Sequence, residues 1–218
     1  MRILLLGATG RTGKLVVGAA LEKGYGVNCL VRDLRGVQLK KGVEVYEGSP
    51  INRADIEKAL HGCGSVINVL NVSRKSDFPW APLKSPKNLI SDTISKVIEI
   101  TKGTAVTRII TCSAWGVHET KRDIPFWFRS LIDWSNIGIA YADHERQENL
   151  LEKTSLDWTI VRPVGLTNSK KHQEVLESFE NVPKPNLTIS RKAVANYLVN
   201  CIEKEDLIRK KVVISTKR

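Results

Sequence analysis

The sequence predicts a single α/β domain, a doubly wound parallel sheet of about seven strands with flanking helices. Three observations lead to this prediction. Short apolar runs alternate with stretches of helical periodicity along the whole chain. The apolar runs are continuous, which is typical of strands that are buried on both faces of a parallel sheet. A glycine-rich turn joins the first apolar run to the first helical stretch. Regular alternation of strand and helix then requires right-handed crossovers between parallel strands.

The elements follow from these patterns in chain order. We expect strands at residues 3–6, 27–31, 43–46, 65–69, 108–113, 158–162, 187–189 and 212–215. We expect helices at residues 14–23, 54–60, 87–102, 143–153 and 191–204. Gly24 ends the first helix, and Asn52 and Gly62 bound the second.

Residues 1–218 form one predicted domain, because no internal repeat or low-complexity linker divides them. Two segments, 73–85 and 116–138, show neither strand nor helix pattern. Both follow the carboxyl ends of predicted strands, which is the edge where ligands bind in open α/β sheets. We therefore expect both segments to be loops that cover a substrate.

The composition excludes several classes of protein. Of 218 residues, 42% are hydrophobic and 26% are charged, unlike a coiled coil, a collagen or a disordered tail. The four cysteines and four histidines are scattered, so we predict neither disulfides nor a metal site. The first apolar run is too short for a signal peptide, and no stretch is long enough to span a membrane. We expect a cytoplasmic protein without a membrane partner.

The net charge of +11 raises the question of nucleic-acid binding. The basic excess is spread over both ends of the chain and forms no long basic arm, which argues against a nucleic-acid partner. A solvated basic surface is the simpler interpretation. The alternative is electrostatic steering of an anionic ligand, such as a phosphorylated cofactor.

The sequence GATGRTG at residues 7–13 is the strongest functional signal. It directly follows the first strand and opens the first helix, the context of a dinucleotide-binding loop. Gly7 permits a tight turn, Gly10 admits a pyrophosphate, and Gly13 allows close packing of helix on strand. The helix start offers free N–H groups to the phosphates. We assign cofactor binding to Gly7, Thr9, Gly10, Arg11, Thr12 and Gly13.

The end of the second strand bears on the choice between NADP and NAD. An acidic residue there would bind the ribose 2′-hydroxyl of NAD, whereas an arginine accommodates the 2′-phosphate of NADP. Arg32 comes first, with Arg11 and Arg35 nearby, so NADP is the preferred cofactor. Asp33 keeps NAD as the alternative.

The sequence resembles the atypical short-chain dehydrogenase/reductases, and within them the group of biliverdin/flavin reductases and NmrA-like regulators. The matching pieces, which span nearly the whole chain, are GATGRTG (7–13), LVRD (30–33), IITCSAWG (109–116), ADHERQENLLEKTSLDWTIVRP (142–163) and TISRKAVANYLVNCI (188–202). The resemblance implies a Rossmann core that binds NAD(P)H. Ser49 stands near where relatives carry an acidic residue beside the adenine. Leu70, Pro163 and Val164 follow strand ends, and we expect them beside the cofactor.

The catalytic residues of the family are only partly present. The resemblance assigns Ser113 to the family's catalytic serine. The family's Tyr-x-x-x-Lys motif is absent, because Tyr141 is followed four residues later by Glu145. In an alignment anchored on Glu148, His144 falls at the lysine position. We therefore name Ser113, Tyr141 and His144 as the catalytic candidates.

Two further departures concern the proton donor. The same alignment puts Ala140 at the tyrosine position, and Val164 stands where biliverdin/flavin reductases carry a histidine.

A surface location is the simpler interpretation of His144, which we expect near a helix start. Cys112 is more typical of a core residue than of a nucleophile, since no histidine lies near it in the sequence.

Aromatic residues are concentrated in the second irregular segment. Trp115, Phe126, Trp127 and Trp134 form either a stacking wall for a flat substrate or a local core under a long loop. Trp115 and Trp127 are the substrate-contact candidates under the first alternative.

Three functions fit these features. The first is an NAD(P)H-dependent oxidoreductase, monomeric or homodimeric, which transfers a hydride to a small flat conjugated acceptor such as a flavin, a quinone or a similar carbonyl. The second is a catalytically weak NAD(P)-binding redox sensor of the NmrA type, which the lost Tyr-Lys pair favours. The third is a sugar-nucleotide epimerase or dehydratase, which fits less well because such enzymes are longer and use that pair.

Overall fold

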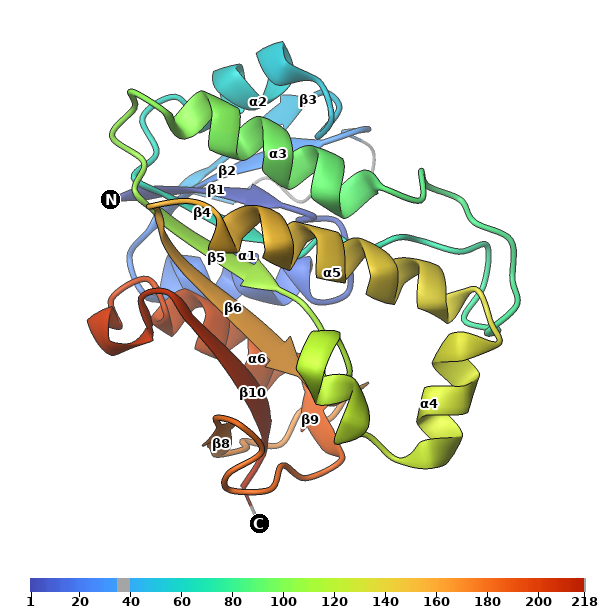
Figure 1. Cartoon of the computed structure of the whole chain (residues 1–218). Coiled ribbons are helices and arrows are strands. Elements are labelled where there is room, and N and C mark those ends of the chain that lie inside the picture. Colours follow the sequence, from blue (N-terminus) through green and yellow to red (C-terminus); the bar gives the residue numbers. More distant parts are fainter. Residues whose placement is uncertain (35–39, 218) are drawn as a thin grey trace.

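Figure 1 shows the computed structural model, which describes residues 1–34 and 40–217. Eight strands form the central sheet in the order β3-β2-β1-β4-β5-β6-β10-β8. All neighbouring strands of this sheet are parallel except β10 and β8. The strands are β1 (Arg2–Leu6), β2 (Gly26–Val31), β3 (Val43–Glu47), β4 (Ser65–Asn68), β5 (Arg108–Cys112), β6 (Asp157–Pro163), β8 (Val175–Ser178) and β10 (Lys210–Thr216). The predicted fold class is confirmed.

Helices cover both faces of the sheet (Figure 1). One face carries α1 (Gly13–Glu22) and α6 (Arg191–Asn200), and the other carries α2 (Arg53–Leu60), α3 (Leu89–Thr101) and α5 (Ile137–Glu152). A short helix, α4 (Phe126–Asp133), packs on α5 near the end of the sheet. Within the described ranges, no helix is long and apolar enough to cross a lipid bilayer.

The continuous apolar runs follow from this three-layer arrangement. Successive side chains of a strand point to opposite faces of the sheet. Ile3 and Leu5 of β1 therefore belong to the core under α1 and α6, whereas Leu4 and Leu6 belong to the core under α2 and α3. All four side chains are fully buried, which is why β1 shows no polar alternation.

The site is positioned by a reversal of strand order. From β1 the chain moves outward to β2 and β3, and it then returns to β4 on the other side of β1. The carboxyl ends of β1 and β4, where the strand order reverses, are the usual ligand site of this architecture. The glycine loop 7–13 occupies the first of these positions.

The structure differs from the sequence prediction at several elements. α5 begins at Ile137, six residues before the expected start, and α6 ends at Asn200. The expected strand 187–189 is β9 (Thr188–Ser190), which pairs with β7 (Gly165–Thr167) outside the main sheet. β7 and β8 were not predicted, because they are short and largely exposed or half-buried.

The two segments expected to be loops have different structures. Residues 73–85 are irregular, held by an isolated bridge between Arg74 and Leu83. Residues 116–138 are not one loop, since they contain the 3-10 helix η1 (His118–Arg122) and α4. A second 3-10 helix, η2 (Glu205–Leu207), precedes β10.

Candidate functional site

The glycine loop is built so that two of its positions accept no side chain. Gly7 has φ +92°, and a Cβ there would lie 3.0 Å from the backbone N of Leu70. A Cβ at Gly13 would lie 2.0 Å from the carbonyl oxygen of Gly7. The loop therefore packs directly on the end of β4, and α1 packs directly on the loop.

The start of α1 offers unpaired backbone donors. The N–H of Lys14 donates a hydrogen bond to the Gly10 carbonyl oxygen at 3.0 Å. The N–H groups of Arg11, Thr12 and Gly13 make no hydrogen bond within residues 1–34 and 40–217. A Cβ on the exposed Gly10 would meet only the Gly7 carbonyl, at 3.3 Å, so the loop is open to an approaching group on that side. Free N–H groups at the positive end of a helix fit a pyrophosphate, and the exposed Thr9 lies at the rim of the same loop.

Of the three predicted phosphate-binding arginines, one is exposed and unpaired in the described chain. Arg32 follows β2 and has no hydrogen bond or ion pair in the part of the chain that the structure describes. Arg11 makes two hydrogen bonds to Asp77, at 3.0 and 3.1 Å, and so connects the glycine loop to segment 73–85. Arg35 lies outside the described residues. Asp33 has a partner and is half-buried.

The other predicted cofactor residues all lie at strand ends. Ser49 follows β3, and its N–H binds the Asp55 carboxylate at 2.8 Å. Leu70 follows β4, beside Gly7. Pro163 ends β6 and accepts the N–H of Trp115, whereas Val164 is buried and donates its N–H to Ile214 of β10. The side chain and N–H of Val164 are therefore committed to the fold.

A buried ion pair lies behind Ser113. The Ser113 hydroxyl donates to Glu148 Oε1 at 2.5 Å, and the Arg162 guanidinium binds both oxygens of Glu148, at 2.5 and 3.1 Å. Glu148 and Arg162 are at most 1% exposed. Arg162 also forms a two-point contact with Glu119 of η1. Ser113 thus lies at the strand end where the family places it, but its proton is donated inside the protein.

The pKa values of this network follow from burial and pairing. Burial lowers the pKa of Arg162, but hydrogen bonds to Glu148 and Glu119 outweigh it and raise that pKa overall. Burial alone would raise the pKa of Glu119, yet its bonds to Arg162 lower it to about 2. Arg162 and Glu119 are therefore both charged near neutral pH.

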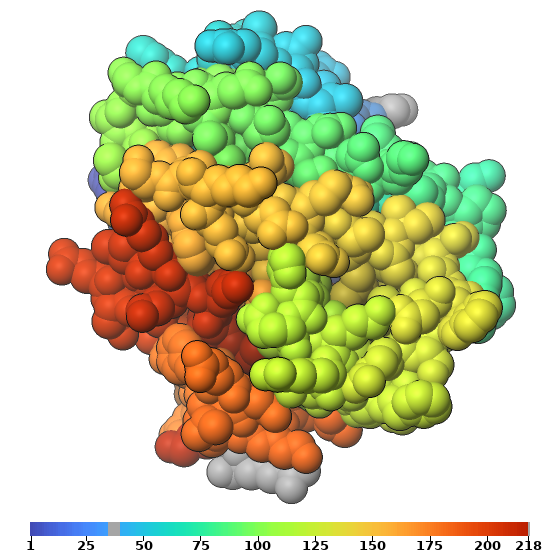
Figure 2. Space-filling model, in the orientation of Figure 1, coloured from blue at the N-terminus to red at the C-terminus, as the bar shows by residue number. Residues whose placement is uncertain are grey.

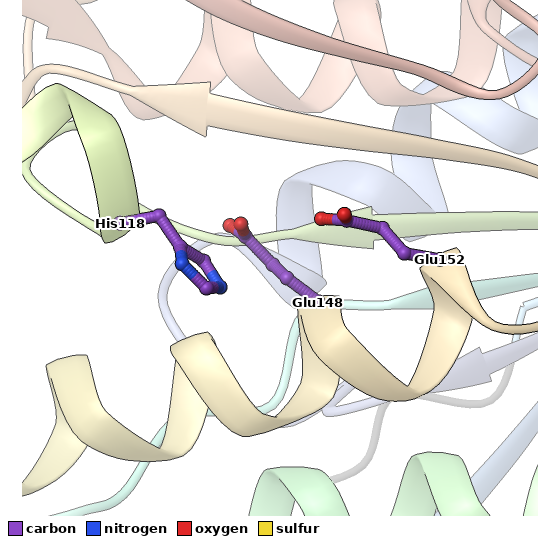
Figure 3. A group of neighbouring side chains, drawn as sticks. All are labelled: His118, Glu148 and Glu152. Carbon is purple, nitrogen blue, oxygen red and sulfur yellow. The ribbon is translucent and has the colours of Figure 1, made fainter.

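Figure 3 shows a cluster of metal-ligand types that the sequence reasoning did not find, because its members are far apart in the chain. Ligand atoms of His118, Glu148 and Glu152 lie within 4.8 Å of one another. Glu148 is neutralised by Arg162, and Glu152 binds Lys211 at 3.1 Å. Since the chain supplies its own cations here, we assign no metal to the cluster.

The hydroxyl of Tyr141 is not free to act as a proton donor. Its hydroxyl donates to the Trp115 carbonyl at 3.2 Å, and its ring packs edge-on against Phe128. Burial raises the pKa of Tyr141. With Gly116 it lines a cavity of about 690 Å³ between η1, α4 and α5.

His144 is not a surface residue, which corrects the simpler interpretation of the sequence. It lies inside α5, on the buried face, and is 4% exposed. Burial lowers its pKa to about 4, so the imidazole is neutral near pH 7. Burial likewise raises the pKa of the Cys112 thiol to about 12, as expected of a core cysteine.

The aromatic residues in and next to segment 116–138 differ in burial. Trp115 is a core residue at 5% exposure, which corrects its assignment to a substrate-facing wall. Trp127 is 66% exposed on α4. The Trp80 ring N–H donates to the Trp134 carbonyl at 2.7 Å, so segments 73–85 and 116–138 lie against each other. In Figure 1 they meet at the end of the molecule opposite the N-terminus, and in Figure 2 they form the adjoining green and yellow surface at that end.

Several polar residues of the site were not found from the sequence. They form two hydrogen-bonded groups at the carboxyl edge of the sheet or beside it. Asn68 and Thr111 both bind Gln147. Arg162 binds Glu119. One signal was available, because Arg162 interrupts an apolar strand, and a charge in such a strand needs a buried partner. The partners themselves come from other elements and carry no local signal.

Comparison with known proteins gives a consistent result. The NAD(P)H-binding family matches residues 7–205. The chain is 30% identical over 185 residues to the photosystem II assembly factor Ycf39 of Trieres chinensis, covering 84% of this chain and 51% of that protein. It is 24% identical to Ycf39 of Synechocystis sp., covering 96% of this chain and 61% of that protein. The chain thus spans about half the length of the first of these relatives.

Solved structures share the fold. An anaerobilin reductase, ChuY, from Escherichia coli O157:H7 has a TM-score of 0.80 at 17% identity, covering 99% of this chain and 97% of that one. A short-chain dehydrogenase/reductase from Veillonella parvula, in complex with NADP, has a TM-score of 0.79 at 17% identity, covering 98% and 94%. At these identities the likeness establishes the Rossmann architecture alone.

Proposed function

Because the chain belongs to the NAD(P)H-binding family, we propose that it is a reductase that uses NADPH to reduce a small, flat, conjugated acceptor. The observation that carries the proposal is the row of unpaired N–H groups of Arg11, Thr12 and Gly13 beside an open Gly10. The dinucleotide, when bound, supplies the hydride. Its pyrophosphate would be held by these donors.

NADPH is preferred over NADH in this proposal because of Arg32. Its guanidinium is exposed, follows β2 and has no partner in the described chain, so it is available to a 2′-phosphate. Arg11 contributes less than the sequence suggested, since both arms of its guanidinium bind Asp77.

We choose the class of acceptor because none of the three catalytic candidates is a free proton donor. Tyr141 is bonded to a backbone carbonyl, Ser113 donates to Glu148, and His144 is neutral. A flavin, a quinone or a similar conjugated carbonyl tolerates this, because it delocalises the charge it gains. The acceptor then takes two electrons and a hydrogen as hydride, and its second hydrogen as a proton from water.

A binding protein without turnover is the second candidate. The committed hydroxyls of Ser113 and Tyr141 favour it, since neither is free to act on a substrate. The curated relatives reported above carry the name of an assembly factor, which fits a chain that binds the dinucleotide and a partner protein. In this case segments 73–85 and 116–138 would contact the partner.

One assay separates the two candidates. NADPH oxidation is followed at its absorbance maximum with a panel of flavins and quinones. Gly10→Val, in which we expect cofactor binding to be lost, serves as the matched control. Steady turnover by wild type, absent in the control, supports the reductase. Tight NADPH binding with no turnover across the panel would overturn it in favour of the binding protein.

A further inference from the structure

A chain of buried hydrogen bonds runs from the loop after β4 to the imidazole of His144. The Leu70 N–H donates to Asn68 Oδ1 at 3.1 Å, and Asn68 Nδ2 donates to Gln147 Oε1 at 3.1 Å. Gln147 Nε2 lies 3.0 Å from His144 Nδ1. Asn68 and Gln147 are fully buried, and His144 nearly so, so no bulk water competes for these contacts.

In each of these hydrogen bonds, the chemistry of the groups fixes which one donates and which one accepts. A backbone N–H only donates, so the atom of Asn68 that faces Leu70 is the amide oxygen and its nitrogen faces Gln147. Gln147 must then present its oxygen to Asn68, and its nitrogen turns to His144.

Two further contacts agree with this orientation of Gln147. The Thr111 hydroxyl donates to Gln147 Oε1 at 2.6 Å. Gln147 Nε2 lies 3.5 Å from the Cys112 carbonyl oxygen, which only accepts. Because the amide nitrogen has two hydrogens and no lone pair to share, His144 Nδ1 has to be the acceptor.

His144 therefore carries its hydrogen on Nε2. That nitrogen makes no hydrogen bond in the described chain, and it is not among the buried atoms without a partner, so it is reached from outside the core. α5 follows β5 and runs back along the sheet, which brings His144 one turn nearer the carboxyl edge than Glu148. His144 therefore lies toward the carboxyl edge of the sheet, the edge at which ligands bind in this architecture.

A positive charge at His144 is disfavoured in two ways. Burial lowers its pKa to about 4, and protonation of Nδ1 would set an N–H against the Gln147 amide hydrogens. The neighbouring Asp143 favours the charged form, but its carboxylate is committed to the start of α3. It accepts from the N–H of Ile90 at 2.7 Å and the Ser91 hydroxyl at 2.5 Å.

We propose that Gln147 is a positioning residue that holds His144 as the neutral Nε2–H tautomer, so that the site presents an uncharged hydrogen-bond donor to an uncharged oxygen of its ligand. The oxygen is a hydroxyl of the cofactor ribose or a carbonyl of the acceptor. This role differs from that of a lysine at the same position, whose ammonium would add a positive charge. The identity of the ligand rests on the proposed function, whereas the tautomer does not.

The tautomer is measured on the ligand-free protein. Long-range ¹H–¹⁵N correlation spectra of histidine-labelled protein distinguish the two neutral tautomers and the cation, and His144→Asn assigns the signals among the four histidines. We expect a protonated Nε2 and a bare Nδ1 between pH 6 and 8, the working range chosen around neutrality. A proton on Nδ1 in wild type would overturn the proposal without any variant.

The positioning role is tested by reversing the polarity of the amide. In Gln147→Glu the carboxylate still accepts from Asn68 and Thr111, but it also accepts from His144. We expect a proton on Nδ1 and a titration midpoint raised by about 1–3 pH units. Gln173→Glu, at a residue whose Oε1 accepts the Ser190 N–H, is the matched control and should leave His144 unchanged. Unchanged His144 spectra in Gln147→Glu would show that Gln147 does not position it.

The ligand oxygen is identified by adding probes to wild type. A shift of the Nε2 signal with NADP⁺ alone assigns the donor to the ribose, and a shift that requires NADP⁺ with FMN assigns it to the acceptor. No shift with either, under conditions where calorimetry shows NADP⁺ bound, overturns the donor role. If calorimetry shows no NADP⁺ binding at all, the proposed function fails while the tautomer result still stands on its own spectrum.

Discussion

Replacement of Arg32 by alanine measures the phosphate preference directly. The guanidinium can form two parallel charge-assisted bonds to a 2′-phosphate, which contribute roughly 1.5–3 kcal/mol when partly desolvated. Arg32 is exposed, so screening by water places the effect at the lower end, about 1.5 kcal/mol. We therefore expect NADPH affinity to fall about tenfold and NADH affinity to change by less than about twofold.

The assay is a pair of calorimetric titrations, NADPH and NADH, on wild type and variant at two salt concentrations. Arg32→Lys is the matched control, because it keeps the charge but loses the fork, and its loss should be smaller than that of alanine. The NADPH preference should also shrink in 1 M salt, where the Debye length is about 3 Å. Equal losses for both cofactors would contradict a contact between Arg32 and the 2′-phosphate. A wild-type preference for NADH would contradict it as well, and would make Asp33 the residue that contacts the ribose.

Three other outcomes follow from the site. Glu148→Gln removes one partner of the buried Arg162 and should cost about 3 kcal/mol, which lowers the thermal midpoint by about 6–12 °C in calorimetry; an unchanged midpoint would contradict a buried ion pair. Tyr141→Phe should lower turnover far less than the ~10²–10⁴-fold expected for a general acid, because its hydroxyl is bonded to the Trp115 carbonyl. Glu119, whose pKa is lowered to about 2, contributes stability that is present above its unfolded pKa and lost as pH falls through about 2. Denaturant titrations of wild type should therefore show a decline in this acid range that Glu119→Gln lacks.

The fold was predictable where each strand is buried on both faces. β1, β2 and β4–β6 read as continuous apolar runs, since helices cover both sides of them. β7 and β8 gave no such run, because β7 (GLT) contains one apolar side chain and β8 (VLES) contains two. The first turns of α5 were missed because Asn136 makes no side-chain cap and Gly138 weakens the helical pattern.

The site was predictable only in its local part. The glycine loop and Arg32 are continuous in sequence with the strands that position them, so spacing alone located them. The surroundings of Ser113 and His144 depend on Glu148, Arg162 and Gln147, which reach them across the fold. No periodicity in the chain reports such contacts.

Calorimetric titration of NADPH into wild type and Gly10→Val measures whether the glycine loop holds the dinucleotide. A Cβ at Gly10 has one close neighbour, the Gly7 carbonyl oxygen at 3.3 Å, which has to yield by a few tenths of an ångström. The valine side chain then fills the space that a pyrophosphate needs. We expect the variant to keep its circular dichroism spectrum and thermal midpoint while NADPH binding is lost. Unchanged NADPH affinity in a folded Gly10→Val would contradict this expectation, because the dinucleotide would then bind somewhere other than the glycine loop.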